Sequence, residues 1–464
     1  MSSLFADGIA PAARYALAAP GDARRRLATG WLWLAVAALV GAGLFSVLLV
    51  LARAPYTKEL FATADFFRVA LVVHVDLSVL VWFAAFGGLL WTLNGGTRHL
   101  GLGWAGLAAA AAGTLAMCAA PFLGTEPPVM SNYVPVLDGP VFLGGLLLFA
   151  AGCVLLVVRA MLAAERVGTR PDGAAALRFG LNAAAVSAAV ALLAFAWSYA
   201  ALPARLEGKA YYEVLFWGGG HVLQFTWTLL MFAAWLALAE AGGARAPLSP
   251  RVALLLFAIA LAAVFATPVI YLAYDITSVE HYRLQTWLMR IGGGLAIVPF
   301  ALATLTALAT APRAEPAQRP LRAALWGSLA LFGAGGLIGL AIEGSNVKIP
   351  AHYHGAIVGV TLAFMGLAYH LLPRLGGARP EPRLATVQAW LYGAGQLAHI
   401  AGLVWSGGYG VQRKVAGAEQ VLRGTEQIAA MGLMGAGGLA AVAGGVLFIF
   451  IVLRSLWTSP GSRS

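Results

Sequence analysis

The chain has 464 residues, of which 61% are hydrophobic and only 11% are charged, and its mean hydropathy is +0.82. A soluble globular protein of this length needs more polar surface, so the composition excludes that class and predicts a polytopic membrane protein. The net charge of +11 does not indicate a nucleic-acid partner. The arginines lie in short loops between apolar runs, and no basic, aromatic groove accompanies them.

Twelve apolar runs are long enough to cross a bilayer, which takes about 20 residues in a helix. In chain order they lie near residues 29–52, 67–94, 103–123, 139–161, 178–203, 212–240, 251–275, 284–310, 321–343, 352–373, 386–406 and 427–454. We therefore predict an all-α polytopic membrane protein with twelve transmembrane helices. The expected organisation is a cytoplasmic N-terminal segment at 1–28, a single twelve-helix membrane domain at 29–456 and a cytoplasmic tail at 457–464.

Positive charge indicates the orientation of these helices. The loops on the side of the two termini carry most of the arginines, for example Arg98, Arg166 and Arg319, whereas the opposite loops carry fewer, apart from a cluster around Arg413. Because basic loops stay on the cytoplasmic side, we expect both termini in the cytoplasm. The predicted location is a bacterial-type inner membrane, crossed many times and in contact with its lipid.

Histidines are the ionisable residues that stand out in these apolar runs. Five of them fall in the outer layer of the predicted bundle: His74, His221, His281, His352 and His354. Charged or ionisable side chains are costly in a bilayer, so a shared layer of them predicts a functional site. The remaining three are interpreted as structural or exposed: His99, His370 and His399.

The tenth run begins with two histidines in "AHYHGAIVG", where His352 and His354 are separated by one residue. Successive helical residues are turned by about 100°, so these two side chains point about 200° apart. They cannot bind one small ion together, but they can bind two large planar cofactors on either side of the helix. Imidazole is a common axial ligand of haem iron, and two axial histidines make a closed electron-transfer site. A single axial histidine leaves an open position for a small molecule.

With these stretches the chain resembles catalytic subunit I of the heme–copper oxidase superfamily over nearly its whole length. The resemblance is carried by the twelve runs and by "VVHVDLSVLVW", "WGGGHVLQFTW" and "AHYHGAIVGVTLAFMG". The second-run stretch "FFRVALVVHVDLSVLVW" looks most like nitric-oxide reductase large subunits and their oxidase relatives.

The resemblance implies two haems and one non-haem metal. His74 and His354 would be the axial ligands of a low-spin haem, and His352 the single protein ligand of a high-spin haem. His221 would bind the second metal opposite that haem. Haem propionates in this superfamily point outward, where the cations that could pair with them are Lys348, Arg413 and Lys414.

The chain departs from the superfamily at the second metal. It has no adjacent His-His pair after the seventh run, where the sequence reads "TPVIYLAYDITSVEHYRLQTWL". Asp275, Glu280 and His281 are the candidates to complete a site with His221. A mixed carboxylate and imidazole site favours iron over copper. The alternative, that these three are ordinary outer-loop residues, stays open. Phe225 stands where many oxygen reductases carry a tyrosine.

The function predicted from these features is that of a respiratory terminal reductase that converts a small gas. Nitric oxide, reduced to nitrous oxide, is preferred over dioxygen because of the missing tyrosine. The residues expected to be catalytic are His221, His352 and Asp275. Electrons would come from a subunit carrying cytochrome c or copper, or from quinol. The alternatives are an oxygen reductase, a non-catalytic haem subunit for electron transfer or sensing, and a proton transporter.

Overall fold

The computed structural model describes residues 15–60, 64–124, 126–169 and 171–458, and most of these residues are helical. The predicted all-α membrane fold is therefore confirmed. The rest of the predicted terminal segments, at 1–14 and 459–464, lies outside the described residues. Eleven helices in the described part are long and apolar enough to span a membrane. The run at 386–406 lies in α15 (Pro382–Gly408), a long helix that is not among the eleven because its polar residues lower its hydropathy.

Contacts within the chain gather the helices into two compact units. Unit 1 comprises Met1–Leu34, Phe83–Gly124 and Val129–Arg313. Unit 2 comprises Ala35–Trp82, Thr125–Pro128 and Ala314–Ser464. The single domain expected at 29–456 and the cytoplasmic location of both termini stay predictions.

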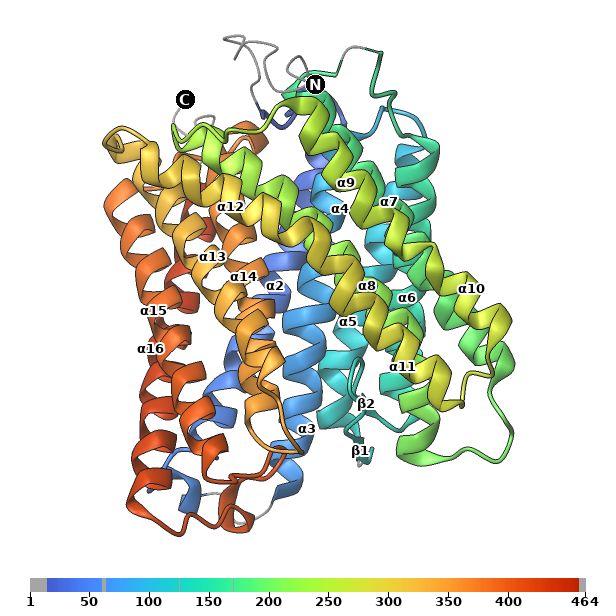
Figure 1. Ribbon diagram of the computed structural model, residues 1–464, viewed down its shortest axis with the longest axis vertical. Coiled ribbons are helices and arrows are strands. Elements are labelled where there is room, and N and C mark those ends of the chain that lie inside the picture. Colours follow the sequence, from blue (N-terminus) through green and yellow to red (C-terminus); the bar gives the residue numbers. More distant parts are fainter. Residues whose placement is uncertain (1–14, 61–63, 125, 170, 459–464) are drawn as a thin grey trace. The chain divides into compact units, whose positions relative to one another are not determined.

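Unit 1 contains the middle of the chain. Its elements are the start of α2 (Arg24–Leu51), α4 (Trp82–Asn94), α5 (Leu100–Leu123), β1 (Pro128–Val129), β2 (Val136–Leu137), α6 (Pro140–Leu162), α7 (Gly173–Ala201), α8 (Gly208–Ala241), α9 (Pro250–Val264), α10 (Ala266–Ala273), α11 (Val279–Trp287), the π-helical turn η3 (Leu288–Gly293) and α12 (Gly294–Thr310). α5 packs along α6, and α7 packs along α8 (Figure 1). α8 is apolar on all sides and largely buried, which is typical of a helix in the centre of a bundle.

Unit 2 combines a segment early in the chain, Ala35–Trp82, with the C-terminal part from Ala314 onward. Its elements are the rest of α2, η1 (Thr57–Leu60), α3 (Ala64–Val75), the π-helical turn η2 (Asp76–Val81), η4 (Pro316–Gln318), α13 (Arg319–Leu340), α14 (Lys348–Leu371), η5 (Leu372–Leu375), α15, η6 (Gly417–Glu419) and α16 (Thr425–Trp457). α13 packs along α14 and α15 along α16, shown in yellow to red in Figure 1.

Glycines bring the paired helices of unit 2 into close contact. A Cβ atom added to Gly335 of α13 would collide with the backbone of Gly355 and Ala356 in α14. The same holds for Gly395 of α15 against Gly437 and Ala441 of α16. Small residues at a crossing let helix backbones approach closely in a membrane protein, which is the role expected of the glycine-rich runs. This close approach brings backbone carbonyls of one helix within reach of side chains on the next.

Candidate functional site

His74 lies near the end of α3 in unit 2 and is half-buried. Its Nδ1 is 3.0 Å from the carbonyl oxygen of Ala42 in α2. A carbonyl only accepts, so Nδ1 must carry the proton, and Nε2 of the neutral ring holds the lone pair. Imidazoles that bind a metal commonly donate their other N–H in this way. Within the described residues no group makes a hydrogen bond to Nε2 of His74, so this atom fits an axial ligand.

His352 is held in the same way from a different helix. Its Nδ1 is 2.7 Å from the carbonyl oxygen of Gly335 in α13. The glycines of α13 make this possible, because a Cβ at Gly335 would force α13 and α14 apart and a Cβ at Gly339 would lie 2.7 Å from Nδ1 of His352. The carbonyl fixes the proton on Nδ1, so the lone pair of the neutral ring is on Nε2. His352 therefore also fits an axial ligand.

His354 projects to the other side of α14. Its ring lies against His399 of α15, with ring centroids 4.7 Å apart, and the residues that act on it electrostatically include His399, His74 and Arg53. His352 thus contacts α13 while His354 contacts α15, as expected from the turn of about 100° per residue. The structure therefore places His74 and His354, the predicted axial pair, in one neighbourhood.

His399 belongs to this neighbourhood, although its sequence led us to interpret it as structural. It is 8% exposed, and its Nδ1 is 2.9 Å from the carbonyl oxygen of Met434 in α16. The cluster of histidines in unit 2 therefore has three members, from α3, α14 and α15. In the sequence, a single histidine in a glycine-rich run looks the same whether it belongs to a cluster of histidines or is a buried structural residue.

Arg53 is a cation close to these rings, and nothing in the sequence pointed to it. It follows α2, where its Nε donates to Oε1 of Gln420 and its Nη2 to the carbonyl oxygen of Gln412, both at 3.2 Å. Burial lowers the pKa of Arg53 to about 10, which leaves it charged at neutral pH. It acts electrostatically on His354 and His399. No carboxylate of the described chain lies within ion-pair distance of it, so Arg53 fits an anionic group of a bound cofactor.

Two of the three cations predicted to meet the propionates lie in the loop that holds Arg53, whereas Lys348 begins α14. Arg413 and Lys414 are half-buried, and Lys414 adopts a left-handed backbone conformation with φ 58°. The loop places them next to Gln412, whose carbonyl accepts from Arg53. Arg53 therefore lies near Arg413 and Lys414, at the ends of α2 and α15 in unit 2.

Asp76 is an intramembrane acid of unit 2 that the sequence analysis missed. It is 2% exposed, and neither carboxylate oxygen has a hydrogen-bond partner within the described residues. It begins the π-helical turn η2, two residues after His74. Buried unpartnered polar groups and π-helical turns are both typical of functional sites.

In unit 1, His221 lies on α8 and is 3% exposed. Its Nδ1 is 2.8 Å from the carbonyl oxygen of Trp217, one turn earlier in the same helix. Its Nε2 is 2.9 Å from the hydroxyl of Tyr133, in the loop between β1 and β2. The carbonyl fixes the proton on Nδ1, so Nε2 accepts from the phenol. Both ring nitrogens of His221 are therefore engaged by protein groups.

The three glycines before His221 build this contact. A Cβ at Gly220 would lie inside the ring of Tyr133, and one at Gly218 would collide with the hydroxyl of Tyr271. A Cβ at Gly219 would overlap the ring of Phe195. The motif "GGGH" thus lets three aromatic rings from three other segments pack against the backbone of α8. The sequence displays this motif, but not which rings it admits.

The other predicted metal ligands do not form a ligand set with His221, although His281 is near enough to act on it electrostatically. Asp275 is exposed between α10 and α11, and its carboxylate accepts from the amide and hydroxyl of Thr277 at 2.8 and 2.5 Å, which lowers its pKa. Glu280 is exposed in the first turn of α11. His281 is 1% exposed, its ring lies edge-on to Tyr271, and its Nδ1 has no partner among the described residues. Across the described residues no three His, Cys, Asp or Glu side chains are grouped to hold a metal ion.

Phe225, one turn after His221, packs in an apolar cluster with Val190, Ala191, Val222 and Val264. The expectation that α8 carries no phenol at this position therefore holds. The phenol beside His221 comes instead from Tyr133, 88 residues away in the sequence.

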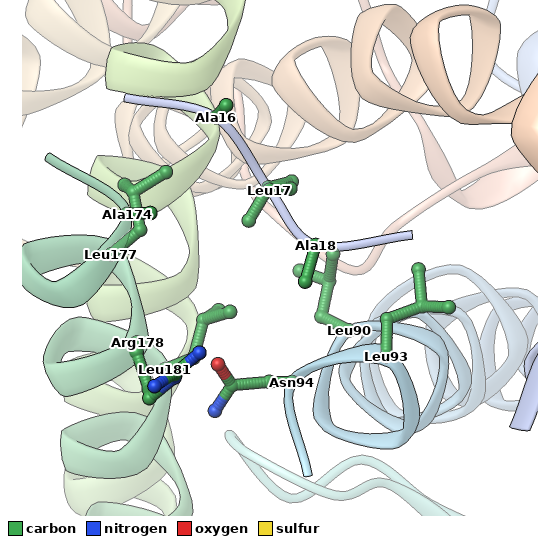
Figure 2. A pocket seen from close by; sticks show the side chains of 10 residues that line it. All are labelled: Ala16, Leu17, Ala18, Leu90, Leu93, Asn94, Ala174, Leu177, Arg178 and Leu181. Carbon is green, nitrogen blue, oxygen red and sulfur yellow. The ribbon is translucent and has the colours of Figure 1, made fainter. Parts of the chain in front are cut away.

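A pocket elsewhere in unit 1 has an empty volume of about 350 Å³. Figure 2 shows the segment Ala16–Ala18 crossing between the end of α4 and the start of α7, with Asn94 and Arg178 as the polar lining residues. Both are engaged, since Asn94 donates to Asn182 at 2.8 Å and Arg178 pairs with Glu165 at 3.4 Å. None of the predicted site residues lines this pocket.

Comparison with known proteins identifies the family. The family model described as cytochrome c and quinol oxidase polypeptide I matches residues 26–440. The chain belongs to this family. An uncharacterized protein of Rickettsia prowazekii (strain Madrid E) is 27% identical over 507 aligned positions, which cover 94% of this chain and 97% of that protein. An uncharacterized protein of Aquifex aeolicus (strain VF5) is 29% identical over 350, covering 75% and 84%.

Among solved structures, one described as a heme-copper terminal oxidase dimer matches with a TM-score of 0.72 at 17% identity. The match covers 95% of this chain and 85% of that chain, and it shows the shared fold. The predicted resemblance to subunit I of the heme–copper oxidase superfamily is therefore confirmed. Members of this oxidoreductase family bind haems and a metal centre, and they take electrons from donors such as cytochrome c or quinol.

Proposed function

We propose that this family member is a haem-containing respiratory oxidoreductase whose unit 2 holds both haems. His74 and His354 would bind the low-spin haem, and His352 would bind the high-spin haem. The observation that carries the proposal is the anchoring of His74 and His352, each with Nδ1 on a backbone carbonyl of a neighbouring helix. When bound, a haem with two axial histidines carries single electrons, and one with an open position also binds a small gas.

The two sides of α14 support two separate haem sites. His352 contacts α13 and His354 contacts the side of α15, so one helix presents an imidazole to each side. Within unit 2, electrons would pass between the two sites across this single helix. The short separation of His352 and His354 in the chain fits such a transfer.

Arg53 would pair with a propionate of the low-spin haem, assisted by Arg413 and Lys414. A guanidinium binds a carboxylate with two parallel hydrogen bonds, and a charge-assisted contact of this kind strengthens when it is partly desolvated. Arg53 is held in place by Gln412 and Gln420, so its orientation is set before the cofactor binds. Its charge would also act on the haem iron.

For the gas, nitric oxide remains the first candidate, with nitrous oxide as product. The support is Phe225, which leaves α8 without a phenol next to His221. Dioxygen is the second candidate, and Tyr133 favours it, because it supplies a phenol to His221 from another segment. The electron donor would be a subunit carrying cytochrome c or copper, or quinol. The non-haem iron expected from the sequence does not enter the proposal, because His221, Asp275 and Glu280 do not present a ligand set.

Spectra and turnover of the purified full-length chain test the proposal. We expect a reduced-minus-oxidised spectrum with a low-spin haem, a high-spin haem whose spectrum shifts with carbon monoxide, and consumption of nitric oxide faster than of dioxygen. A spectrum without haem would leave the proton-transporter alternative. Haem without turnover of either gas would point to an electron-transfer or sensing subunit. Faster consumption of dioxygen would reverse the ranking of the two gases.

A further inference from the structure

We propose that Tyr133 occupies the remaining coordination position of His221, so that unit 1 carries an imidazole–phenol pair and no non-haem metal. This inference goes beyond the proposed function, because it concerns unit 1 and does not depend on either haem. It is an alternative to the non-haem iron site that the sequence led us to expect.

The hydrogen bonding of His221 is complete without a metal. A neutral imidazole has one N–H donor and one acceptor nitrogen. The donor faces the carbonyl of Trp217 at 2.8 Å, and the acceptor faces the phenol of Tyr133 at 2.9 Å. A metal ion binds imidazole nitrogen at about 2.0–2.1 Å along the lone pair. Binding at Nε2 would therefore displace the phenol from its hydrogen bond, and binding at Nδ1 would break the contact with Trp217.

The pair is built into the packing of α8. Gly220 leaves room for the ring of Tyr133 against the helix backbone. Trp217 packs against both partners, with ring centroids 5.7 Å from Tyr133 and 4.8 Å from His221. His221 is 3% exposed, so water does not compete for either nitrogen. Breaking a buried hydrogen bond of this kind costs about 1–3 kcal/mol if the partners are left unsatisfied.

The two acids that would have to assist a metal point elsewhere. Asp275 caps its own turn through Thr277, and Glu280 faces outward from α11. Within the described part of the chain Nδ1 of the buried His281 has no partner, and its ring lies edge-on against Tyr271 and acts electrostatically on His221. The hydroxyl of Tyr271 is bound to Ser198 at 2.7 Å. A mixed imidazole and carboxylate site would require at least one of these acids to leave its position and turn inward.

The first measurement is the metal content of the full-length chain. Cells are grown with iron and copper, and the purified protein is incubated with Fe²⁺ or with Cu²⁺, desalted, and analysed for transition metals and for haem. We expect iron equal to haem and no other transition metal in stoichiometric amount, in the wild type and in His221→Gln alike. A stoichiometric non-haem metal that is lost in His221→Gln overturns the proposal, including one bound jointly by His221 and the phenolate of Tyr133.

The second measurement detects the hydrogen bond itself. A vibrational difference spectrum between wild type and Tyr133→Phe isolates the C–O stretch of this phenol, and the same difference is recorded in the His221→Gln background. We expect the band to shift when His221 is replaced. Tyr271→Phe is the matched control, because that buried phenol bonds Ser198 and its band should not respond to His221. A Tyr133 band that is unchanged by His221→Gln overturns the pair, and Tyr133→Phe keeps the ring that Gly220 accommodates, so it should fold.

Discussion

His74 of unit 2 and His221 of unit 1 are anchored in the same way through Nδ1, but the surroundings of Nε2 differ between them. In each, a backbone carbonyl fixes the proton on Nδ1: Ala42 for His74 in unit 2, and Trp217 for His221 in unit 1. Nε2 of His74 meets no hydrogen-bonding group of the described chain, whereas Nε2 of His221 meets the phenol of Tyr133. A fixed tautomer therefore prepares a ligand only where nothing in the protein occupies the other nitrogen.

The largest expected effect comes from removing an anchored ligand of unit 2. His74→Ala should abolish the low-spin haem signal and leave the high-spin signal, because the iron loses one of its two axial imidazoles. Optical and electron paramagnetic resonance spectra measure both. His370→Gln, near the C-terminal end of α14, serves as the control and should keep both signals. An intact low-spin spectrum in His74→Ala would remove this residue from the haem site.

Replacing His352, on the other side of α14, should affect the gas-binding haem and spare the low-spin haem. His352→Ala should abolish the spectral shift caused by carbon monoxide while the low-spin signal remains, because only this haem has an open axial position. Titration of the reduced protein with carbon monoxide measures the effect. A full carbon monoxide signal in the variant would show that another residue holds the gas-binding haem.

A smaller effect is expected at Arg53. Arg53→Gln should keep the low-spin haem but lower its midpoint potential, because removing a positive charge stabilises the oxidised iron. Two unit charges about 8 Å apart at an effective dielectric constant of about 20 interact by about 2 kcal/mol, or about 90 mV for one electron. Partial exposure makes this an upper bound. Redox titration measures the shift.

The control for this variant is Arg68→Gln. Arg68 forms an exposed pair with Glu419 at 3.0 Å in the same unit, and pairs of this kind contribute little because water and salt screen them. An equal fall in potential in both variants would show a general loss of positive charge and not a specific role of Arg53.

The smallest effect is expected at Asp275 in unit 1. Asp275→Ala should leave metal content unchanged and destabilise the turn by about 0.5–1.5 kcal/mol, the net value of a hydrogen bond. The hydrogen bonds from Thr277 lower the pKa of Asp275. Its contribution is therefore fully present above the unfolded value of about 3.9 and lost as the pH falls through the lower folded value. Thermal unfolding of wild type and variant at neutral and acidic pH measures this. Loss of turnover at neutral pH with an unchanged midpoint temperature of unfolding would instead support Asp275 as catalytic.

The sequence was sufficient for the helical fold and for the two faces of the tenth helix, because both follow from local periodicity. Hydropathy located the helices, and the spacing of His352 and His354 placed them on opposite sides of α14. It was not sufficient for His399, Arg53 or Tyr133. Their roles depend on contacts between segments far apart in the chain, such as Tyr133 with His221, 88 residues apart. Asp76 was visible in "HVD", but the π-helical turn that buries it was not.

The most direct test of the difference between the units is the ratio of total iron to haem, with copper, in one preparation of the full-length wild-type chain. The account predicts two haems per chain, iron equal to haem, and no stoichiometric copper. In this account imidazoles of unit 2 bind the haems, and in unit 1 the phenol of Tyr133 occupies Nε2 of His221. One iron in excess of haem, or one copper per chain, would contradict it.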